Sequence, residues 1–169
     1  MRFLLFSPII GVLAYLCLWP IPIDPKSWES PKDNGYVKDF AENIELQGLE
    51  FFDVANTHGP EGLAIGPKGN VFASSGEGWI LIHNPLTGTT ERWVNTGGRP
   101  LGITFDKNYN LVVADAYLGL LQIAPSGEIK ILTNKVEDSI IEYADDVDIA
   151  PNGLIYFSDA SSKFGAKKY

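Results

Sequence analysis

The sequence predicts an all-β chain assembled from propeller-type repeats, and three observations predict it. Three stretches share one pattern, in which an apolar strand is followed by a turn of Pro, Asn, Asp, Lys or Gly and then by a second apolar strand. The equivalent positions Ile65, Phe105 and Ile149 are 40 and 44 residues apart, a spacing typical of propeller blades with four short strands each. Helical periodicity is absent after residue 44, which disfavours barrels and sheets covered by helices.

The first 23 residues have the layout of a signal anchor. Residues 3–19 carry no charge, Arg2 precedes them and three prolines follow within six residues. The residues after Trp19 are not the small ones that a cleavage site requires, so we expect residues 1–23 to remain as a membrane-spanning helix. The positive end would stay in the cytoplasm and place the remainder on the extracytoplasmic side. Cleavage followed by secretion, and a buried core helix, are the alternatives.

Two further segments follow the anchor. Residues 24–43 are polar and contain Pro and Gly, so they are predicted to form a linker. Residues 44–169 are predicted to form the β domain, because period-two runs rich in β-branched and aromatic residues alternate with turns. The expected strands lie near residues 63–65, 71–74, 79–83 and 89–94, then 101–105, 111–115, 119–123 and 129–133, then 144–149 and 154–159.

The number of repeats does not close a ring. Two repeats are complete and the third stops after its second strand, which would leave open sheet edges. We expect the sequence to be a piece of a longer protein. If it is not a piece, we expect the chain to assemble into an oligomer.

The composition excludes several classes of protein. The 169 residues are 45% hydrophobic and 20% charged, with 17 Gly and 11 Pro, as in a globular chain of short strands. A formal net charge of −8 argues against a nucleic-acid partner, which attracts Lys and Arg. The single cysteine, Cys17, cannot form an internal disulfide or a thiolate zinc site.

The alignment of the three repeats places candidate functional residues along the predicted channel. Glu61, Leu101 and Asp145 occupy equivalent positions just before the first strand of each repeat, and first strands line the central channel of a propeller. Carboxylates aimed at one point repel unless a cation or proton lies between them. Hard oxygen ligands favour Ca²⁺ and, to a lesser extent, Mg²⁺, and Asp146 and Asp148 add charge nearby. The alternative is an ordinary acidic turn.

Other polar residues give weaker indications. His58 and His83 lack the spacing of a zinc pair, and His83 is expected at the surface of a strand. The run from Ser74 to Gly76 is not a nucleophile elbow. Asp115 and Asp159 both end second strands and are expected to cap turns.

Four motifs resemble the strictosidine synthase-like family. They are Gly-Pro-Glu-Gly at 59–62, Gly-Arg-Pro-Leu-Gly-Ile at 98–103, Ala-Asp-Ala-Tyr-Leu-Gly-Leu at 114–120 and Ile-Tyr-Phe-Ser-Asp-Ala-Ser-Ser-Lys-Phe at 155–164. That family belongs with the paraoxonases and gluconolactonases among six-bladed β-propellers. The resemblance therefore implies the first two to three blades of such a propeller, preceded by an N-terminal hydrophobic helix, as in the membrane-anchored members.

The resemblance also implies a calcium site. In the related propellers the glutamate of the first motif binds the central Ca²⁺, which here is Glu61. Asp145 stands where paraoxonases have a ligating Asn, and Asp146 follows it as the second member of that pair. The histidine that serves lactone hydrolysis in paraoxonases falls at Leu101, which cannot move a proton, so Leu101 and Asp146 are predicted only to line the channel. No catalytic residue is identified.

Three functions remain open at this point. The first is a membrane-anchored, calcium-dependent hydrolase acting on a small ester or lactone. The second is a non-catalytic propeller whose acidic channel binds a ligand or partner. The third is a condensing enzyme of the strictosidine synthase type, whose glutamate comes from a later blade than this sequence contains.

Overall fold

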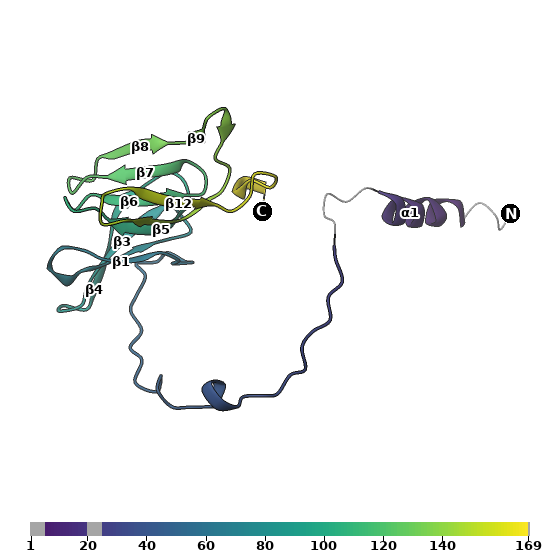
Figure 1. Ribbon diagram of the computed structural model, residues 1–169, viewed down its shortest axis with the longest axis horizontal. Helices are drawn as coiled ribbons and strands as arrows, with labels where there is room; N and C mark the ends of the chain where they lie inside the picture. Colours follow the sequence, from purple (N-terminus) through teal and green to yellow (C-terminus); the bar gives the residue numbers. More distant parts are fainter. Residues whose placement is uncertain (1–5, 20–24, 169) are drawn as a thin grey trace. The chain divides into compact units, whose positions relative to one another are not determined.

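The computed structural model describes residues 6–19 and 25–168 and divides the chain into two units, residues 1–48 and 49–169 (Figure 1). The first unit contains the helix α1 (Phe6–Leu18) and one 3₁₀ turn, η1 (Lys38–Phe40). A helix is thus present near the N-terminus, but with 13 residues it is shorter than the membrane-spanning helix that the sequence predicted. In the described part of the chain, no helix combines the length and the apolar character needed to cross a membrane.

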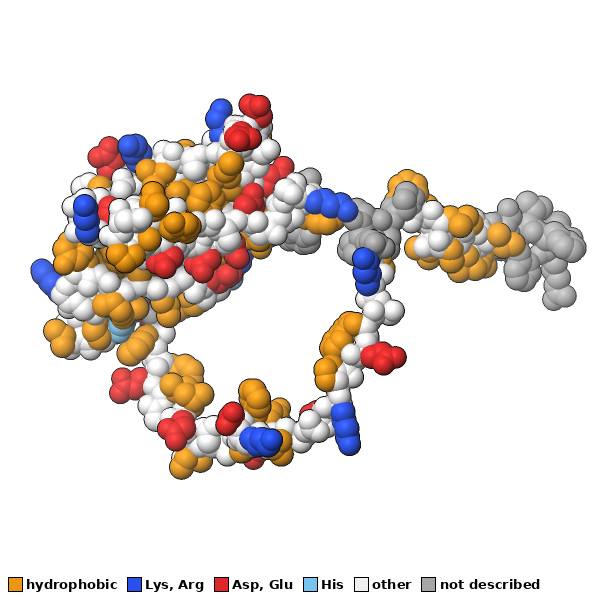
Figure 2. All heavy atoms as spheres, viewed as in Figure 1, with side chains coloured by type: hydrophobic (Ala, Val, Ile, Leu, Met, Phe, Trp, Pro, Cys, Tyr) orange, Lys and Arg blue, Asp and Glu red, His pale blue; other side chains and the backbone are white. Residues whose placement is uncertain are grey.

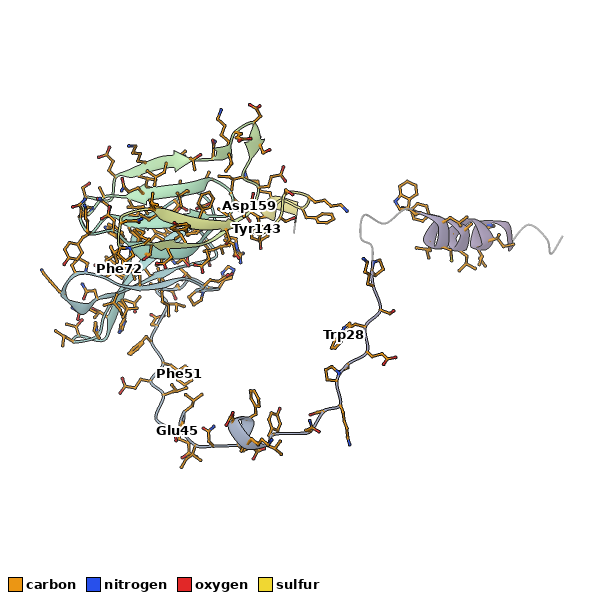
Figure 3. The ribbon with its side chains drawn as sticks, viewed as in Figure 1. Trp28, Glu45, Phe51, Phe72, Tyr143 and Asp159 are labelled. Atoms are coloured by element: carbon orange, nitrogen blue, oxygen red, sulfur yellow. The ribbon has the colours of Figure 1, made fainter. Side chains whose placement is uncertain are left out.

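The other described residues of the first unit lie outside helices and strands. Apolar side chains are exposed along it, among them Trp28, Tyr36 and Phe40 (Figures 2 and 3). The predicted segment boundaries at residues 23 and 43 are not tested by this division and stay predictions.

The second unit is mostly β, with antiparallel sheets, as the sequence predicted. Two four-stranded sheets are simple meanders, in the orders β1-β2-β3-β4 and β5-β6-β7-β8. The first contains β1 (Leu63–Ile65), β2 (Val71–Ser74), β3 (Trp79–Asn84) and β4 (Thr89–Asn95), with the 3₁₀ turn η2 (Pro67–Gly69) between β1 and β2. The second contains β5 (Pro100–Phe105), β6 (Leu111–Asp115), β7 (Gly119–Ile123) and β8 (Ile129–Thr133).

The third repeat contributes a two-stranded sheet of β11 (Ala144–Ile149) and β12 (Ile155–Asp159). A short hairpin precedes it, formed by β9 (Lys135–Val136) and β10 (Ser139–Ile140), and the 3₁₀ turn η3 (Ala166–Lys168) follows it. The sequence did not predict the hairpin, because its strands have only two residues each.

The turn after each first strand repeats the same hydrogen bond. The N–H groups of Gly66, Asp106 and Ala150 each donate to the carbonyl four residues further along, at 2.8, 2.9 and 2.9 Å. These donors keep the 40- and 44-residue spacing of the sequence repeat. In the second turn Tyr109 adopts a φ of 61°, where the other two turns have glycine at positive φ. The three repeats are therefore equivalent in backbone geometry as well as in sequence.

The second sheet is the middle of three layers, and β6 is buried on both faces (Figure 1). Leu111 and Val113 pack towards the first sheet, in a cluster that includes Phe72 and Ile80 (Figure 3). On the opposite face, Val112 and Ala114 pack against residues of the third sheet. A strand covered on both faces needs apolar residues at consecutive positions, which explains the continuous run in β6.

Candidate functional site

The first strands of the three repeats lie side by side, β1 next to β5 and β5 next to β11. Where these strands begin, a cavity of about 280 Å³ opens at the surface. Its lining residues are Glu61, Gly62, Leu101, Gly102, Asp145 and Asp146. The three residues that the repeat register assigned to the channel, Glu61, Leu101 and Asp145, are therefore brought together from three separate repeats, and Asp146 lines the same cavity.

Two β-bulges shape this cavity. The pairing register shifts between Pro100 and Ile103 in β5, and again between Ala144 and Val147 in β11. The residues inside these shifts are the cavity pairs 101–102 and 145–146. A bulge re-aims side chains away from the regular alternation of a strand, and bulges are frequent next to functional sites. The same distortion at equivalent positions explains how successive repeats present the same two positions to the cavity.

Two glycines allow the first strands to approach closely. A Cβ at Gly62 would lie 2.1 Å from the carbonyl oxygen of Leu101, and one at Gly102 would lie 2.4 Å from Oδ1 of Asp146. Any side chain at these positions would push one repeat away from the next. The glycines of the Glu61-Gly62 and Leu101-Gly102 pairs thus permit the small distance between repeats. In the third repeat, Asp146 stands at the position equivalent to these glycines.

Ser74 joins the first two repeats beneath the cavity. Its hydroxyl accepts the N–H of Gly62 at 2.9 Å and donates to the carbonyl of Leu101 at 2.8 Å, and the side chain is fully buried. The equivalent residue of the third repeat, Ser158, accepts the N–H of Asp146 at 3.1 Å. The sequence motif around Ser74 bears only on a nucleophile, whereas the position of Ser74 at the end of a second strand marks it as a structural link.

Arg99 holds Glu61 from the neighbouring repeat. Its Nη2 donates to Oε1 of Glu61 at 2.8 Å, with side chains 35% and 48% exposed respectively. At that exposure an ion pair contributes about 0–1 kcal/mol, so the contact orients the carboxylate more than it stabilises the fold. A carboxylate offers two oxygens, and the Arg99 contact to Oε1 is compatible with a second partner at Oε2. No sequence pattern predicted Arg99 as the partner of Glu61.

The acidic residues of the third repeat diverge. Asp145 and Asp146 line the cavity, whereas Asp148 lines only a neighbouring hollow over β11 and β12, which Asp146 also reaches. Asp146 and Asp148 each accept the N–H of the next residue, at 2.9 and 2.8 Å. Within the described residues, no group of three His, Cys, Asp or Glu side chains converges to hold a metal. The cavity supplies hard oxygen donors of the kind that Ca²⁺ prefers, but not a complete ligand set.

Asp115 and Asp159 cap turns, as predicted. The fully buried Asp115 accepts the Thr96 hydroxyl at 2.8 Å and the N–H of Arg99 at 3.0 Å, together with two N–H groups of the following turn. Asp159 accepts the N–H of Tyr143 at 2.9 Å, which is the same contact one repeat later (Figure 3). These carboxylates hold the chain that enters each first strand.

The surface position expected for His83 is wrong. Its side chain is buried, its Nδ1 lies 2.9 Å from the Thr90 hydroxyl, and its ring packs 4.1 Å from that of Phe52. Phe52 precedes the first strand and covers this face of β3, which no strand periodicity could reveal. Among the described residues, Nε2 of His83 has no hydrogen-bond partner.

His58 is paired with Glu77. One oxygen of the carboxylate accepts the backbone N–H of His58 at 3.1 Å, and the other contacts Nδ1 of the ring. Desolvation raises the pKa of Glu77, but the hydrogen bonds from the backbone and ring of His58 outweigh it and lower that pKa below its ordinary value.

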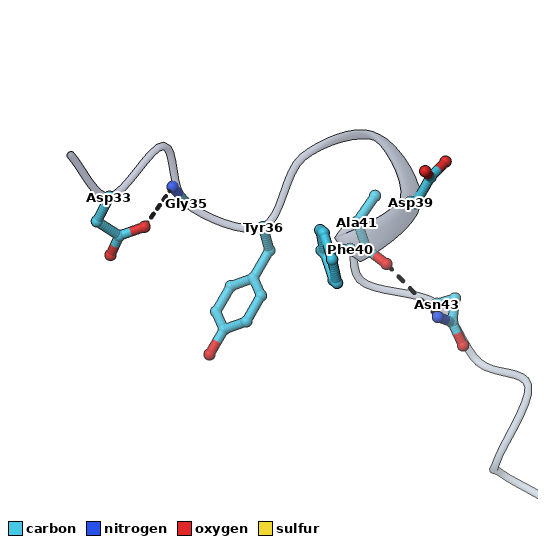
Figure 4. Close-up of a pocket in the computed structure, with 7 residues that line it drawn as sticks. All are labelled: Asp33, Gly35, Tyr36, Asp39, Phe40, Ala41 and Asn43. Atoms are coloured by element: carbon cyan, nitrogen blue, oxygen red, sulfur yellow. Dashed lines mark hydrogen bonds between the residues drawn. The ribbon is translucent and has the colours of Figure 1, made fainter. Parts of the chain in front are cut away.

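A separate hollow in the first unit carries no comparable chemistry (Figure 4). Residues 33–43 line it on their own, as the chain curls through two local turns. Asp33 accepts the N–H of Gly35 at 2.7 Å, and the rings of Tyr36 and Phe40 are exposed. The hollow is formed by the local path of the backbone and not by functional groups that converge from separate segments.

The comparisons with known proteins agree with the sequence motifs. Residues 39–82 match a family model described as strictosidine synthase-like, N-terminal. The chain is 38% identical over 125 residues to Strictosidine synthase-like 4 of Arabidopsis thaliana, covering 70% of this chain and 34% of that protein. It is 31% identical over 180 residues to Strictosidine synthase-like 6 of the same plant, covering 99% and 48%. The chain belongs to the strictosidine synthase-like family.

An animal relative of this strictosidine synthase-like chain is the adipocyte plasma membrane-associated protein of Danio rerio. The two are 28% identical over 179 residues, covering 95% of this chain and 42% of that protein. The chain thus spans between about a third and a half of the length of these relatives.

Solved structures similar to this strictosidine synthase-like chain are six-bladed propellers. A gluconolactonase from Xanthomonas campestris superposes with a TM-score of 0.57 at 20% identity, covering 64% of this chain and 36% of that one. A virginiamycin B lyase from Staphylococcus aureus gives a TM-score of 0.55 at 23% identity, covering 66% and 38%. At these identities the likeness shows the fold alone.

Proposed function

We propose that this chain forms the first two to three blades of a six-bladed propeller that binds Ca²⁺ in its channel and hydrolyses a small ester or lactone. One observation carries the proposal. Glu61 and Asp145 come from the first and third repeats and line one cavity at the start of the first strands. Two carboxylates in one cavity repel each other unless a cation or proton joins them.

Calcium is the cation that these donors favour. Glu61 and Asp145 are hard oxygen ligands, no Cys or His lines the cavity, and Asp146 adds a third carboxylate at its wall. Bound there, Ca²⁺ supplies Lewis-acid stabilisation of a carbonyl oxygen that becomes negative. The chain itself orients Glu61 through Arg99, and Leu101 also lines the cavity.

The family and the fold support an enzyme. The chain shares its fold with a gluconolactonase and a lyase, and hydrolysis of a lactone is the cleavage of an internal ester. The activity, the substrate and the missing ligands are proposals, because the chain covers less than half of its relatives.

The test of this proposal is substitution of the predicted ligand. We expect Glu61→Gln to weaken calcium binding at least about tenfold and to abolish hydrolysis of a phenyl ester, because the amide supplies no charge for the cation. Calorimetry with CaCl₂ and an ester assay with and without EDTA measure the two effects. Glu128→Gln is the matched control, since Glu128 is exposed in the turn between β7 and β8. Calcium-independent hydrolysis that survives Glu61→Gln would overturn the proposal.

A non-catalytic binding propeller is the second candidate. The observation that favours it is Leu101, which occupies the equivalent channel position of the second repeat and cannot transfer a proton. Calcium binding without ester hydrolysis would support this candidate. Condensation of an amine with an aldehyde, independent of calcium, would instead support an enzyme of the strictosidine synthase type.

We also propose that residues 1–23 anchor the protein in a membrane, with the propeller on the extracytoplasmic side. The uncharged run of residues 3–19 behind Arg2 supports this, as does the likeness to a protein named plasma membrane-associated. Residues 1–5 and 20–24 of this segment lie outside the described residues. Secretion after cleavage is the alternative.

A further inference from the structure

His58 and Glu77 form a carboxylate–imidazole pair outside the cavity lining. Glu77 contacts His58 twice, through the backbone N–H at 3.1 Å and through ring Nδ1. The contact of Nδ1 with one carboxylate oxygen orients the imidazole ring, and the backbone contact keeps Glu77 beside it. With Nδ1–H directed at the carboxylate, Nε2 of the neutral ring carries the lone pair. This is the state of a histidine that accepts a proton.

Nε2 of His58 is open to solvent. The side chain of His58 is 77% exposed, and no group of the described residues forms a hydrogen bond with Nε2. Gly76 lies beside it, and a Cβ at that glycine would be only 3.2 Å from Nε2. The N–H of Gly76 donates to the carbonyl of His58 at 2.9 Å, which holds the two segments together. A substrate or water molecule can therefore reach the nitrogen that Glu77 leaves free.

The pair lies at the same end of the first sheet as the cavity, because the start of β1 pairs with the end of β2. Glu77 is in the turn between β2 and β3, and Nδ2 of Asn95 donates to its carbonyl at 3.1 Å. The loop after Asn95 leads directly to Arg99, whose guanidinium holds Glu61. His58 itself precedes Glu61 by three residues. The charged groups at this end of the strands thus include Glu77, Glu61 and Arg99, with Asp145 and Asp146 at the cavity. Glu77 orients His58, and Arg99 orients Glu61.

We infer that His58 is the proton acceptor for ester hydrolysis at this end of the strands and that Glu77 is its positioning residue; the reaction rests on the proposed function. Nε2 takes a proton from water while the water oxygen forms a bond to the carbonyl carbon. The bond from that carbon to the leaving oxygen then breaks, and the proton passes from His58 to the alkoxide. Acid and alcohol are the products, and no oxidant or reductant is required.

The first test reads the tautomer of His58 without any activity. The chain has two histidines, so long-range ¹H–¹⁵N spectra of the full chain contain two rings, and His58→Gln assigns them. We expect neutral His58 to carry its proton on Nδ1, and Glu77→Gln to move the population towards the Nε2–H form. Glu128→Gln is the control and should change neither ring. The inference would be overturned if neutral His58 carried its proton on Nε2 in the unaltered chain, or if Glu77→Gln left the tautomer population unchanged.

The second test separates this role from a structural one. We expect His58→Gln to lower kcat for a phenyl ester by about 10²-fold or more with a small change in KM, and to remove the acid limb of the pH profile. Glu77→Gln should shift that limb and lower kcat less. Calcium affinity should be unchanged in both variants, because neither residue lines the cavity.

The outcomes of the second test are distinct. Hydrolysis that depends on calcium and on Glu61 but keeps its pH profile in His58→Gln would refute the role of His58 and leave the proposed function standing. Absence of calcium-dependent hydrolysis in the unaltered chain would refute both.

Discussion

Asp106 shows what a single carboxylate does in the turn that every repeat shares. Its Oδ1 accepts the N–H groups of Asn108 and Asn110, both at 2.8 Å, and its Oδ2 accepts side-chain amides of Asn110 and Gln122 at 2.8 and 3.3 Å. Desolvation raises the pKa of Asp106, but these hydrogen bonds outweigh it and hold that pKa below its usual 3.8. The ionised form is therefore favoured in the folded chain.

The lowered pKa predicts a specific dependence of stability on pH. A carboxyl group whose pKa is depressed by folding stabilises the fold above its unfolded pKa, and this contribution is lost as the pH falls through the folded value. We expect Asp106→Asn to lower the free energy of unfolding at pH 7 by about 1 kcal/mol, and by less below pH 3.8. Urea unfolding followed by tryptophan fluorescence at the two pH values measures this.

Asp138→Asn is the control for Asp106→Asn, because Asp138 is exposed in the hairpin between β9 and β10. A loss of stability of the same size at both pH values would contradict the assignment to the ionised carboxylate. The buried Asp115 differs from Asp106, since besides capping its own turn it accepts hydrogen bonds from Thr96 and Arg99 of the segment that enters β5.

At the scale of elements, the cavity depends on how closely the first strands approach one another. The buried Ser74 links Gly62, just before β1, to Leu101 of β5 through two hydrogen bonds. At Gly62 and Gly102 the neighbouring repeats approach so closely that no side chain would fit between them. The carboxylates of Glu61 and Asp145 can share a cation only while this spacing is kept.

Gly102→Ala tests this spacing. The added Cβ would lie 2.4 Å from Oδ1 and 2.6 Å from Cα of Asp146, so backbone as well as side chain must move. We expect a loss of about 1–3 kcal/mol in unfolding free energy, as for overpacked interiors, together with weaker calcium binding. Thermal unfolding and calorimetry measure the two effects. Gly48→Ala should change neither, because no atom lies within 4 Å of the added carbon, and an unchanged Gly102→Ala would show that the contact is easily relieved.

At the scale of the whole molecule, both outer layers present apolar side chains to solvent. Leu63 and Ile65 of β1 are 67% and 70% exposed, and at the other side Leu154 and Tyr156 are 56% and 61% exposed. In a closed propeller these faces would pack against further blades. The exposed apolar residues agree with the proposal that the chain is part of a larger ring.

The mass of the native protein tests that proposal. We expect an antibody against residues 44–169 to detect, in the membrane fraction of the source cells, a species of about twice 18.5 kDa that resists extraction with alkaline carbonate. A membrane-resident species of 18.5 kDa would mean that partial rings pair or that the ring is not closed. A soluble species outside the cells would favour cleavage of the anchor and secretion.

Most of the local structure follows from patterns within a few residues. Period-two alternation and turn residues located the strands of both four-stranded sheets, because a strand and its turn are specified by neighbours in sequence. The repeat register located Glu61, Leu101 and Asp145 at one cavity, since equivalent positions of successive repeats meet at the same place in the fold.

Contacts between distant segments required the folded chain. The pairing of Arg99 with Glu61, the link through Ser74 and the pair of His58 with Glu77 leave no periodic trace, because each depends on which loops meet at the cavity end of the strands. His83 was misplaced for the same reason, since Phe52 covers it from outside the strand pattern. Sequence repetition thus specifies which positions are equivalent. Only the packing of the repeats against one another decides which side chains contact and orient the residues at those positions.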